Sequence, residues 1–150
     1  MTAKADIDLF LSQKTIAVVG ASRNKAKFGY TIFNELKTRG YKVYPVNPNA
    51  ESIDGTPCFA SLAALPEVPG GVICVTPPPQ TEKAVAEALG LGVRSLWLQQ
   101  GAESASAVES ARKAGAAVVS GECVFMFLPN GAWFHRFHGW INGLMGKTPK

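Results

Sequence analysis

A loop close to the N-terminus gathers residue types that bind phosphate. An apolar, β-branched run ends at Gly20, and the residues behind it include the hydroxyl of Ser22 and the cations Arg23 and Lys25. A helical pattern starts at Phe28, and the N-terminus of a helix offers unpaired N–H groups and a partial positive charge. Strand, glycine, basic loop and helix follow in the order that suits charge-assisted phosphate contacts. The sequence therefore predicts a phosphate site in this loop, with a solvated basic turn as the alternative.

The loop matches neither of the two common nucleotide motifs. A dinucleotide fingerprint would have its second glycine at position 22, where Ser22 stands, and no Walker A sequence is present. The next apolar run ends in Val46, Asn47 and Pro48, whereas an NAD site usually has Asp or Glu there to bind the ribose. NAD is therefore disfavoured, and NADP stays open because basic residues lie nearby.

Two more apolar runs end in residues that could line a ligand site. Thr76 and Pro77 follow the third run, and two further prolines come after them. Prolines are stiff and lack an N–H, so they could form an apolar wall for an adenine ring, or they could simply begin the next helix. The fourth run is followed by Gln99, Gln100 and Gly101. These residues offer amide donors and acceptors, or form a plain turn.

Catalytic and metal-binding patterns are weak in this chain. His135 and His138 have a spacing that places both rings on one helix face, but no third ligand stands near them. No G-x-S-x-G sequence is present, and no histidine pairs with a candidate Ser or Cys. We therefore predict no catalytic residue and no metal site. Four aromatic residues flank the histidines and indicate a docking segment for a second copy or a protein partner: Trp133, Phe134, Phe137 and Trp140.

Strand and helix patterns alternate along the chain and would position these residues. Helices are predicted at 6–13, 28–39, 80–91 and 103–114, and strands at 15–20, 41–46, 71–75, 94–98 and 116–120. Several strands are apolar throughout, as in a parallel sheet that helices cover on both faces. The predicted fold class is α/β, a Rossmann-type parallel sheet of about five strands with helices on both faces. Its ligand would lie beyond the carboxyl ends of the strands, where the strand order reverses.

Composition agrees with one domain spanning residues 1–150, in which 129–150 form an aromatic C-terminal tail. About 47% of the 150 residues are apolar, but no run approaches a membrane span and the N-terminus does not resemble a signal peptide. We therefore expect a cytoplasmic protein without membrane contact. The net charge of +4 favours anionic partners. Nucleic acid is disfavoured because basic and aromatic residues do not interleave on a strand. Three cysteines at wide spacing predict no disulfide framework, and Cys74 is expected to be an inert core thiol.

Four segments of the chain together resemble the CoA-binding domain family, which includes the N-terminal domain of the succinyl-CoA synthetase α subunit and of ADP-forming acyl-CoA synthetases. The segments are Ile16–Ser22, Gly40–Pro48, Val75–Pro79 and Leu96–Gly101. The likeness covers about residues 10 to 128. Its most specific parts are the V-N-P strand end and the W-L-Q-x-G segment.

The resemblance implies that coenzyme A lies across the strand ends. Its phosphates would meet the loop after the first strand, its nucleotide part would lie along the second and third strand ends, and the glutamine turn would border the site further along. The synthetases use a phosphohistidine in a later domain, and His135 and His138 do not match it. The resemblance thus implies CoA or acyl-CoA binding without ligase activity; the alternative is an NADP- or nucleotide-binding, oxidoreductase-like domain. The residues expected to bind are Gly20, Ala21, Ser22, Arg23, Lys25, Asn47, Pro48, Val75, Thr76, Pro77, Gln99, Gln100 and Gly101.

Overall fold

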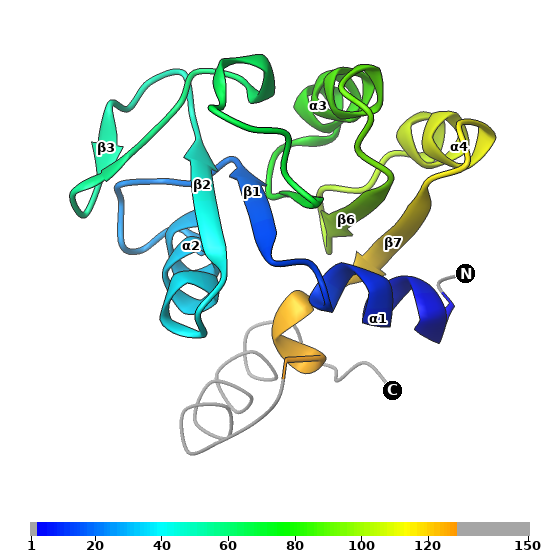
Figure 1. Ribbon diagram of the computed structural model, residues 1–150, viewed down its shortest axis with the longest axis horizontal. Helices are drawn as coiled ribbons and strands as arrows, with labels where there is room; N and C mark the ends of the chain where they lie inside the picture. Colours follow the sequence, from blue (N-terminus) through cyan, green and yellow to red (C-terminus); the bar gives the residue numbers. More distant parts are fainter. Residues whose placement is uncertain (1–2, 129–150) are drawn as a thin grey trace.

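Five strands pair in parallel in the order β2-β1-β5-β6-β7 in the computed structural model, which describes residues 3–128 (Figure 1). The strands are β1 (Thr15–Val19), β2 (Lys42–Val46), β5 (Gly71–Cys74), β6 (Ser95–Gln99) and β7 (Ala117–Glu122). The chain moves outward from β1 to β2 and then returns to the other side of β1 with β5. The strand order therefore reverses between β1 and β5, which is where open α/β sheets bind their ligands.

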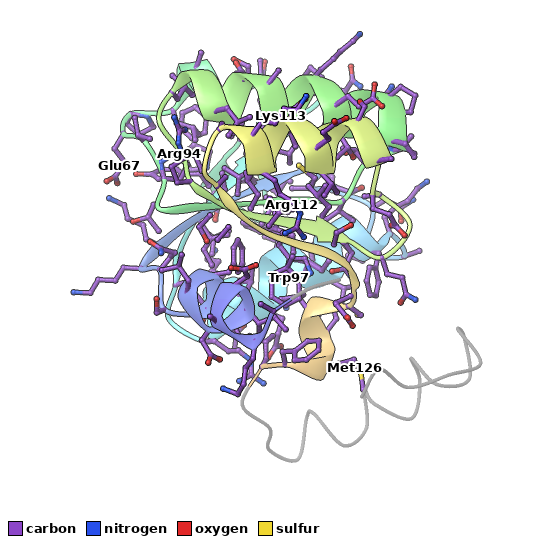
Figure 2. The ribbon with its side chains drawn as sticks, turned by 90° about the vertical axis from the view of Figure 1, so that its right-hand side faces the viewer. Glu67, Arg94, Trp97, Arg112, Lys113 and Met126 are labelled. Atoms are coloured by element: carbon purple, nitrogen blue, oxygen red, sulfur yellow. The ribbon has the colours of Figure 1, made fainter. Side chains whose placement is uncertain are left out.

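Helices cover both faces of this sheet (Figure 2). One face packs against α1 (Lys4–Leu11) and α2 (Phe28–Thr38), and the other against α3 (Pro78–Gly90) and α4 (Ala105–Lys113). The predicted Rossmann-type fold, with about five parallel strands and helices on both faces, is thereby confirmed. The middle residues of β1, β5 and β6 are apolar because both faces of the sheet are buried there.

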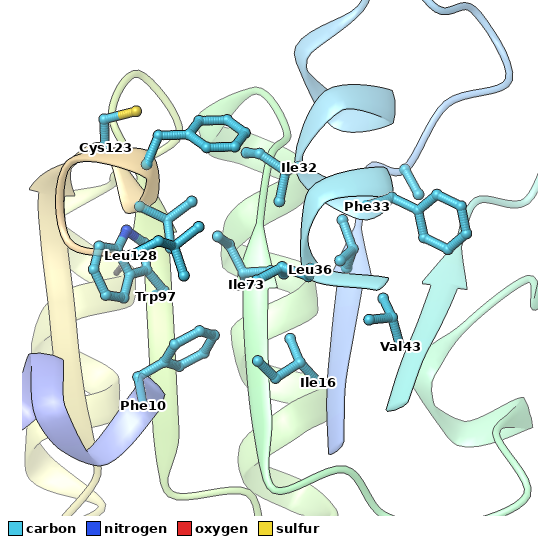
Figure 3. Packing of buried hydrophobic residues seen from close by; sticks show 14 of the residues in the cluster. Phe10, Ile16, Ile32, Phe33, Leu36, Val43, Ile73, Trp97, Cys123 and Leu128 are labelled. Atoms are coloured by element: carbon cyan, nitrogen blue, oxygen red, sulfur yellow. The ribbon is translucent and has the colours of Figure 1, made fainter. Parts of the chain in front are cut away.

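Large side chains fill the face under α1 and α2 (Figure 3). Trp97 of β6 belongs to this cluster and is fully buried. Phe10 of α1 meets the Trp97 ring edge-on at a centroid distance of 5.4 Å. The opposite face is built from smaller side chains, because α3 and α4 present alanines such as Ala88 and Ala111 to the sheet. These small residues let the two helices approach the strands closely.

A short hairpin that the sequence patterns above did not predict follows β2. Its strands are β3 (Ser52–Ile53) and β4 (Thr56–Pro57), and Asp54 and Gly55 form the turn between them with φ angles of 49° and 79°. Two positive φ values are the mark of a type I′ turn, for which Asp-Gly is a preferred sequence. The hairpin lies beyond the β2 edge of the sheet (Figure 1). It is tied to α2 by a hydrogen bond from the Tyr30 hydroxyl to the Asp54 carboxylate.

The remaining elements agree with the predicted boundaries to within a few residues. The helix expected at 80–91 begins at Pro78, and the last strand runs to Glu122 rather than ending at 120. Short 3₁₀ turns, η1 (Leu62–Ala64) and η2 (Val124–Met126), follow the hairpin and β7. The tail at 129–150, with His135 and His138, lies outside the described residues.

Residues 3–128 contain neither a membrane-spanning helix nor a cluster of metal ligands. Between residues 3 and 128 the model has no helix with both the length and the apolar character that a membrane crossing requires. Over the same range, His, Cys, Asp and Glu side chains nowhere gather in threes around a point where a metal ion could bind.

Candidate functional site

Gly20 stands at the reversal of the strand order, directly after β1, with a φ of +96°. A Cβ atom at this position would lie 2.3 Å from the carbonyl oxygen of Val75 and 2.9 Å from Cγ2 of Thr76. The Gly20 N–H also donates to the Val46 carbonyl at 3.0 Å. The end of β1 is thus pressed between the ends of β2 and β5, and glycine alone satisfies both the backbone angle and the space.

The helix behind the loop approaches equally closely. A Cβ atom at Gly29, in the first turn of α2, would lie 2.1 Å from the Gly20 carbonyl oxygen. No side chain caps this helix N-terminus. The first N–H groups of an α-helix lack partners within the helix, so the start of α2 can present donors beside the loop. This is the geometry in which helix N-termini receive anions.

Asn47 fixes the loop after β1 to the loop after β2. Its Nδ2 donates to the Ala21 carbonyl at 2.8 Å, and its Oδ1 accepts the Asn49 N–H at 2.8 Å. Its backbone N–H donates to the Phe59 carbonyl at 2.8 Å. Asn47 was predicted as a ligand contact, and the hydrogen bonds give it a positioning role: both polar ends of its side chain already bond backbone groups.

Replacing Asn47 by leucine is therefore expected to lower the free energy of unfolding by about 1–3 kcal/mol, because the Ala21 carbonyl and the Asn49 N–H lose their partner. Urea denaturation followed by circular dichroism measures the loss. Asn47→Asp is the comparison variant, since aspartate keeps the acceptor for Asn49 but sets a carboxylate oxygen against the Ala21 carbonyl; its loss should be at least as large near neutral pH and should shrink, relative to the unmodified protein, when acid protonates the carboxyl group and restores a donor. A loss that does not depend on pH would contradict the hydrogen bond to Ala21.

Three clefts lie side by side along the strand ends. The loop cleft, of about 480 Å³, is lined by Ser22, Arg23, Asn24, Asn47, Asn49 and Ala50. The central cleft, of about 440 Å³, includes Gly20, Asn47, Pro48, Thr76 and Pro77 in its lining. The glutamine cleft, of about 330 Å³, is lined by Phe28, Val75, Thr76, Pro77 and the segment Gln99–Ala102. Neighbouring clefts share residues, namely Asn47 and Asn49 or Thr76 and Pro77, so they form one continuous row.

Most of the residues predicted to bind are brought together in this row. Two are not part of its lining. Ala21 is fully buried in the core below α2, and Lys25 lies with its Nζ 5.9 Å from the ring centroid of Tyr30. The sequence reasoning missed the contribution of Phe28 and of the α3 residues Gln80, Lys83 and Glu87. Helical spacing places those three on one face of α3, but only the fold shows that this face borders a cleft.

Only one of the three consecutive prolines lines the clefts. Pro77 is the N-cap residue of α3 and borders both the central and the glutamine clefts. Pro78 and Pro79 form the first turn of the helix, where proline is favoured because its missing N–H is not needed. The wall considered for an adenine ring is therefore limited to Pro77, and helix initiation accounts for the other two.

The two glutamines after β6 have different surroundings. Gln99 is 1% exposed; its Oε1 accepts the Val124 N–H at 3.1 Å and its Nε2 contacts the Cys123 sulfur at 3.1 Å. Gln99 thus fastens β6 to η2. The Oε1 atom of Gln100 is buried and has no hydrogen-bond partner among residues 3–128. Of this pair, Gln100 is the residue with hydrogen-bonding capacity left for a ligand.

Ionisable groups near the row are few. Burial raises the pKa of the Cys74 thiol to about 12, in line with an inert core thiol. Burial also raises the pKa of the partly buried Cys58 thiol, although its contact with the Asn47 carbonyl and, more weakly, the charge of Arg23 oppose this shift. Neither thiol is predisposed to form a nucleophilic thiolate near neutral pH.

Two larger hollows lie away from the strand ends that the topology singles out. One, of about 730 Å³, follows the outer side of α4 and includes Val108 and Arg112. The other, of about 530 Å³, includes Lys14 and Lys42 at the amino ends of β1 and β2. Neither contains a residue of the row, and we place the functional site by topology and residue type rather than by size.

Comparison with known proteins adds a family and several relatives. The family described as CoA binding domain matches residues 14–129. The α subunit of an ADP-forming acetate–CoA ligase II from Pyrococcus furiosus is 31% identical over 129 residues, which are 79% of this chain and 28% of that protein. The chain therefore matches less than a third of the length of that ligase subunit.

Solved structures share the fold. A conserved hypothetical protein from Pyrococcus furiosus is 39% identical with a TM-score of 0.71, over 74% of this chain and 96% of that one. The dinucleotide-forming acetyl-coenzyme A synthetase 1 of Ca. Korarchaeum cryptofilum is 25% identical with a TM-score of 0.62. That likeness covers 70% of this chain and 25% of the synthetase.

Proposed function

The chain belongs to the CoA-binding domain family, and from that premise we propose that its row of strand-end clefts binds coenzyme A or an acyl-CoA. The observation that carries the proposal is the close packing of Gly20 against Val75 and Thr76. A Cβ at Gly20 would collide with the Val75 carbonyl oxygen, so glycine lets the ends of β1 and β5 pack closely at the strand-order reversal and brings the loop after β1 to the edge of the clefts. In such sheets the first glycine after the strand forms the tight turn that brings the following loop to the phosphate.

The three clefts suit the three parts of this ligand. In our proposal the diphosphate lies in the loop cleft, against Ser22 and Arg23. The adenosine lies in the central cleft, beside Pro48 and Pro77. The pantetheine arm is attached to the diphosphate, so in this arrangement it runs past the start of α2, without crossing the adenosine, into the glutamine cleft, where Phe28 and Val75 supply apolar surface and Gln100 faces the amides of the arm.

We further propose that this domain binds the cofactor without ligase chemistry of its own. Support comes from the match to the ligase subunit, which covers 28% of that protein. The burial-raised pKa values of the Cys58 and Cys74 thiols also offer no activated nucleophile at the strand ends. The domain would then hold an acyl-CoA for another protein or another domain. Association through the aromatic tail remains a prediction.

Arg23→Ala is expected to weaken CoA binding by about 1.5 kcal/mol, or roughly tenfold in Kd, through loss of a charge-assisted contact to the diphosphate. Lys25→Ala is the matched control, because Lys25 belongs to the same exposed loop but lies against Tyr30 and not in the loop cleft. Calorimetry with CoA, acetyl-CoA, NADP and NAD makes the measurement. Absent CoA binding together with tight NADP binding would overturn the proposal, and an unchanged Kd in Arg23→Ala would remove Arg23 from the site.

A further inference from the structure

The central cleft has a cationic side chain that the phosphate loop does not account for. Of the described residues that line this cleft, two are ionisable, Lys83 and Glu87. Both belong to α3, four residues apart, so they lie on the same side of the helix. Their chemistry therefore decides which charge a ligand in the cleft would meet.

Glu87 is already engaged with backbone groups across the cleft. Its Oε1 accepts the Leu62 N–H at 3.2 Å and its Oε2 accepts the Ala63 N–H at 3.1 Å. These hydrogen bonds hold η1 against α3 and close the outer side of the central cleft. The Glu87 carboxylate thus serves the wall of the cleft, and its two oxygens are directed to η1.

Lys83 is exposed, and in the part of the chain that the structure describes its ammonium forms no ion pair. It lies one turn closer than Glu87 to the start of α3, and so closer to the strand ends. An exposed ammonium at the rim of this cleft is a suitable partner for an anionic substituent of the ligand.

The N-terminus of α3 cannot take over this role. Pro78 and Pro79 have no N–H, and the next two N–H groups, of Gln80 and Thr81, both donate to the Pro77 carbonyl at 3.0 Å. A helix start that lacks free N–H groups loses the donors through which helices bind anions. An anion in the central cleft therefore depends on Lys83 for its contact with α3.

The site thus contains two separate cationic positions, Arg23 in the loop cleft and Lys83 in the central cleft, joined through Asn47 and Asn49. A ligand with a single anionic group would need only one of them. Coenzyme A has a diphosphate on the 5′ oxygen and a monophosphate on the 3′ oxygen of the same ribose. We propose that Lys83 binds this ribose phosphate and so selects CoA over ligands that lack it. The inference rests on the proposed function and deepens it.

Calorimetric titration of the full chain with CoA and with dephospho-CoA tests the proposal. The unmodified protein should bind CoA roughly tenfold more tightly, the effect of one partly exposed charge-assisted contact. Lys83→Met keeps the apolar stem and removes the charge, so it should bring the affinity for CoA down to that for dephospho-CoA and leave the latter unchanged. Lys83→Arg should keep the preference. Lys113→Met is the matched control, because Lys113 is also exposed but pairs with Glu109 on α4 and lines none of the three clefts.

Three results would overturn the inference. The first is equal affinity of the unmodified protein for CoA and dephospho-CoA, which would leave the proposed function standing. The second is an equal weakening of both ligands by Lys83→Met, which would mean a structural role. The third is tighter binding of adenosine 2′,5′-bisphosphate than of the 3′,5′ isomer, which would assign the Lys83 subsite to an NADP-type ligand. If neither CoA nor dephospho-CoA binds at all, the proposed function itself fails.

Discussion

Gly20→Ala is expected to lower the free energy of unfolding by about 2–5 kcal/mol and to abolish measurable CoA binding. Two costs combine. A left-handed backbone costs an alanine roughly 1–2 kcal/mol, and Gly20 has a φ of +96°. The second cost is steric, because the new Cβ would lie 2.3 Å from the Val75 carbonyl oxygen. Forcing atoms into a filled space costs about 1–3 kcal/mol more.

The steric cost cannot be relieved by a small shift of side chains. The colliding atom belongs to the backbone, and the Val75 N–H donates to the Val19 carbonyl at 2.8 Å, which fixes this strand end beside β1. Relief would require β1 and β5 to move apart where the clefts meet. The variant should therefore lose ligand affinity by more than its stability loss alone explains.

Gly40→Ala separates the two costs. Gly40 has nearly the same backbone angle, φ +97°, but a Cβ there would meet no heavy atom within 4 Å. This control should lose only the roughly 1–2 kcal/mol of the left-handed backbone and should bind CoA normally, since it lies at the other end of the sheet. Urea denaturation and calorimetry on both variants give the comparison. Similar losses of unfolding free energy in both variants would show that Gly20 is required for its φ alone and that its close contact with Val75 adds no steric cost.

The fold could be predicted from the sequence because its dominant physical requirement is visible there. A strand buried on both faces must be apolar at every position, as in Ile16–Val19 and Leu96–Leu98, and no other common element has that pattern at such short length. The prolines at 77–79 also mark the start of α3, and the glycines at 40 and 115 follow closely on the ends of α2 and α4. The hairpin was missed because its strands have two residues each, too few for a periodic pattern, although Asp54-Gly55 is a known turn signal.

The candidate site could be predicted in position but not in roles. Parallel topology brings all carboxyl strand ends to one edge, so residues after apolar runs had to gather there. Which of them remain available to a ligand depends on partners distant in the sequence. Asn47 is engaged by Ala21, and Gln99 by Val124, 26 and 25 residues away. Lys25 and Arg23 are neighbours of the same type, and only the fold distinguishes the one in the loop cleft. Lys83 could not be identified from the sequence for the same reason: its face of the helix has the pattern of an ordinary solvated surface, and only the fold shows that it borders a cleft.

The second large effect is expected for Trp97→Ala, which should lower the free energy of unfolding by about 3–5 kcal/mol, the range for removing a large aromatic side chain from a core. Trp97 is fully buried, meets Phe10 at 5.4 Å and Phe127 at 5.9 Å between ring centroids, and donates from Nε1 to the Glu122 carbonyl at 3.0 Å. Its ring joins α1, β6 and the end of β7 into one packed unit (Figure 3). Alanine would leave a cavity that three separate elements cannot close together.

Trp97→Phe distinguishes packing from hydrogen bonding. The Glu122 carbonyl also accepts the Gln100 N–H at 3.2 Å, so removal of the indole donor leaves it with a partner. Phenylalanine keeps most of the ring volume, and its loss of unfolding free energy should be about 1–2 kcal/mol, mostly from incomplete filling of the space.

Because Trp97 packs on the α1 face of the sheet and lines none of the three clefts, the Trp97→Phe variant should bind CoA with unchanged affinity. Urea denaturation followed at far-ultraviolet wavelengths measures both variants without relying on tryptophan emission. If Trp97→Phe loses as much as Trp97→Ala, the hydrogen bond and not the packing dominates; if it also loses CoA affinity, β6 transmits core packing to the glutamine turn.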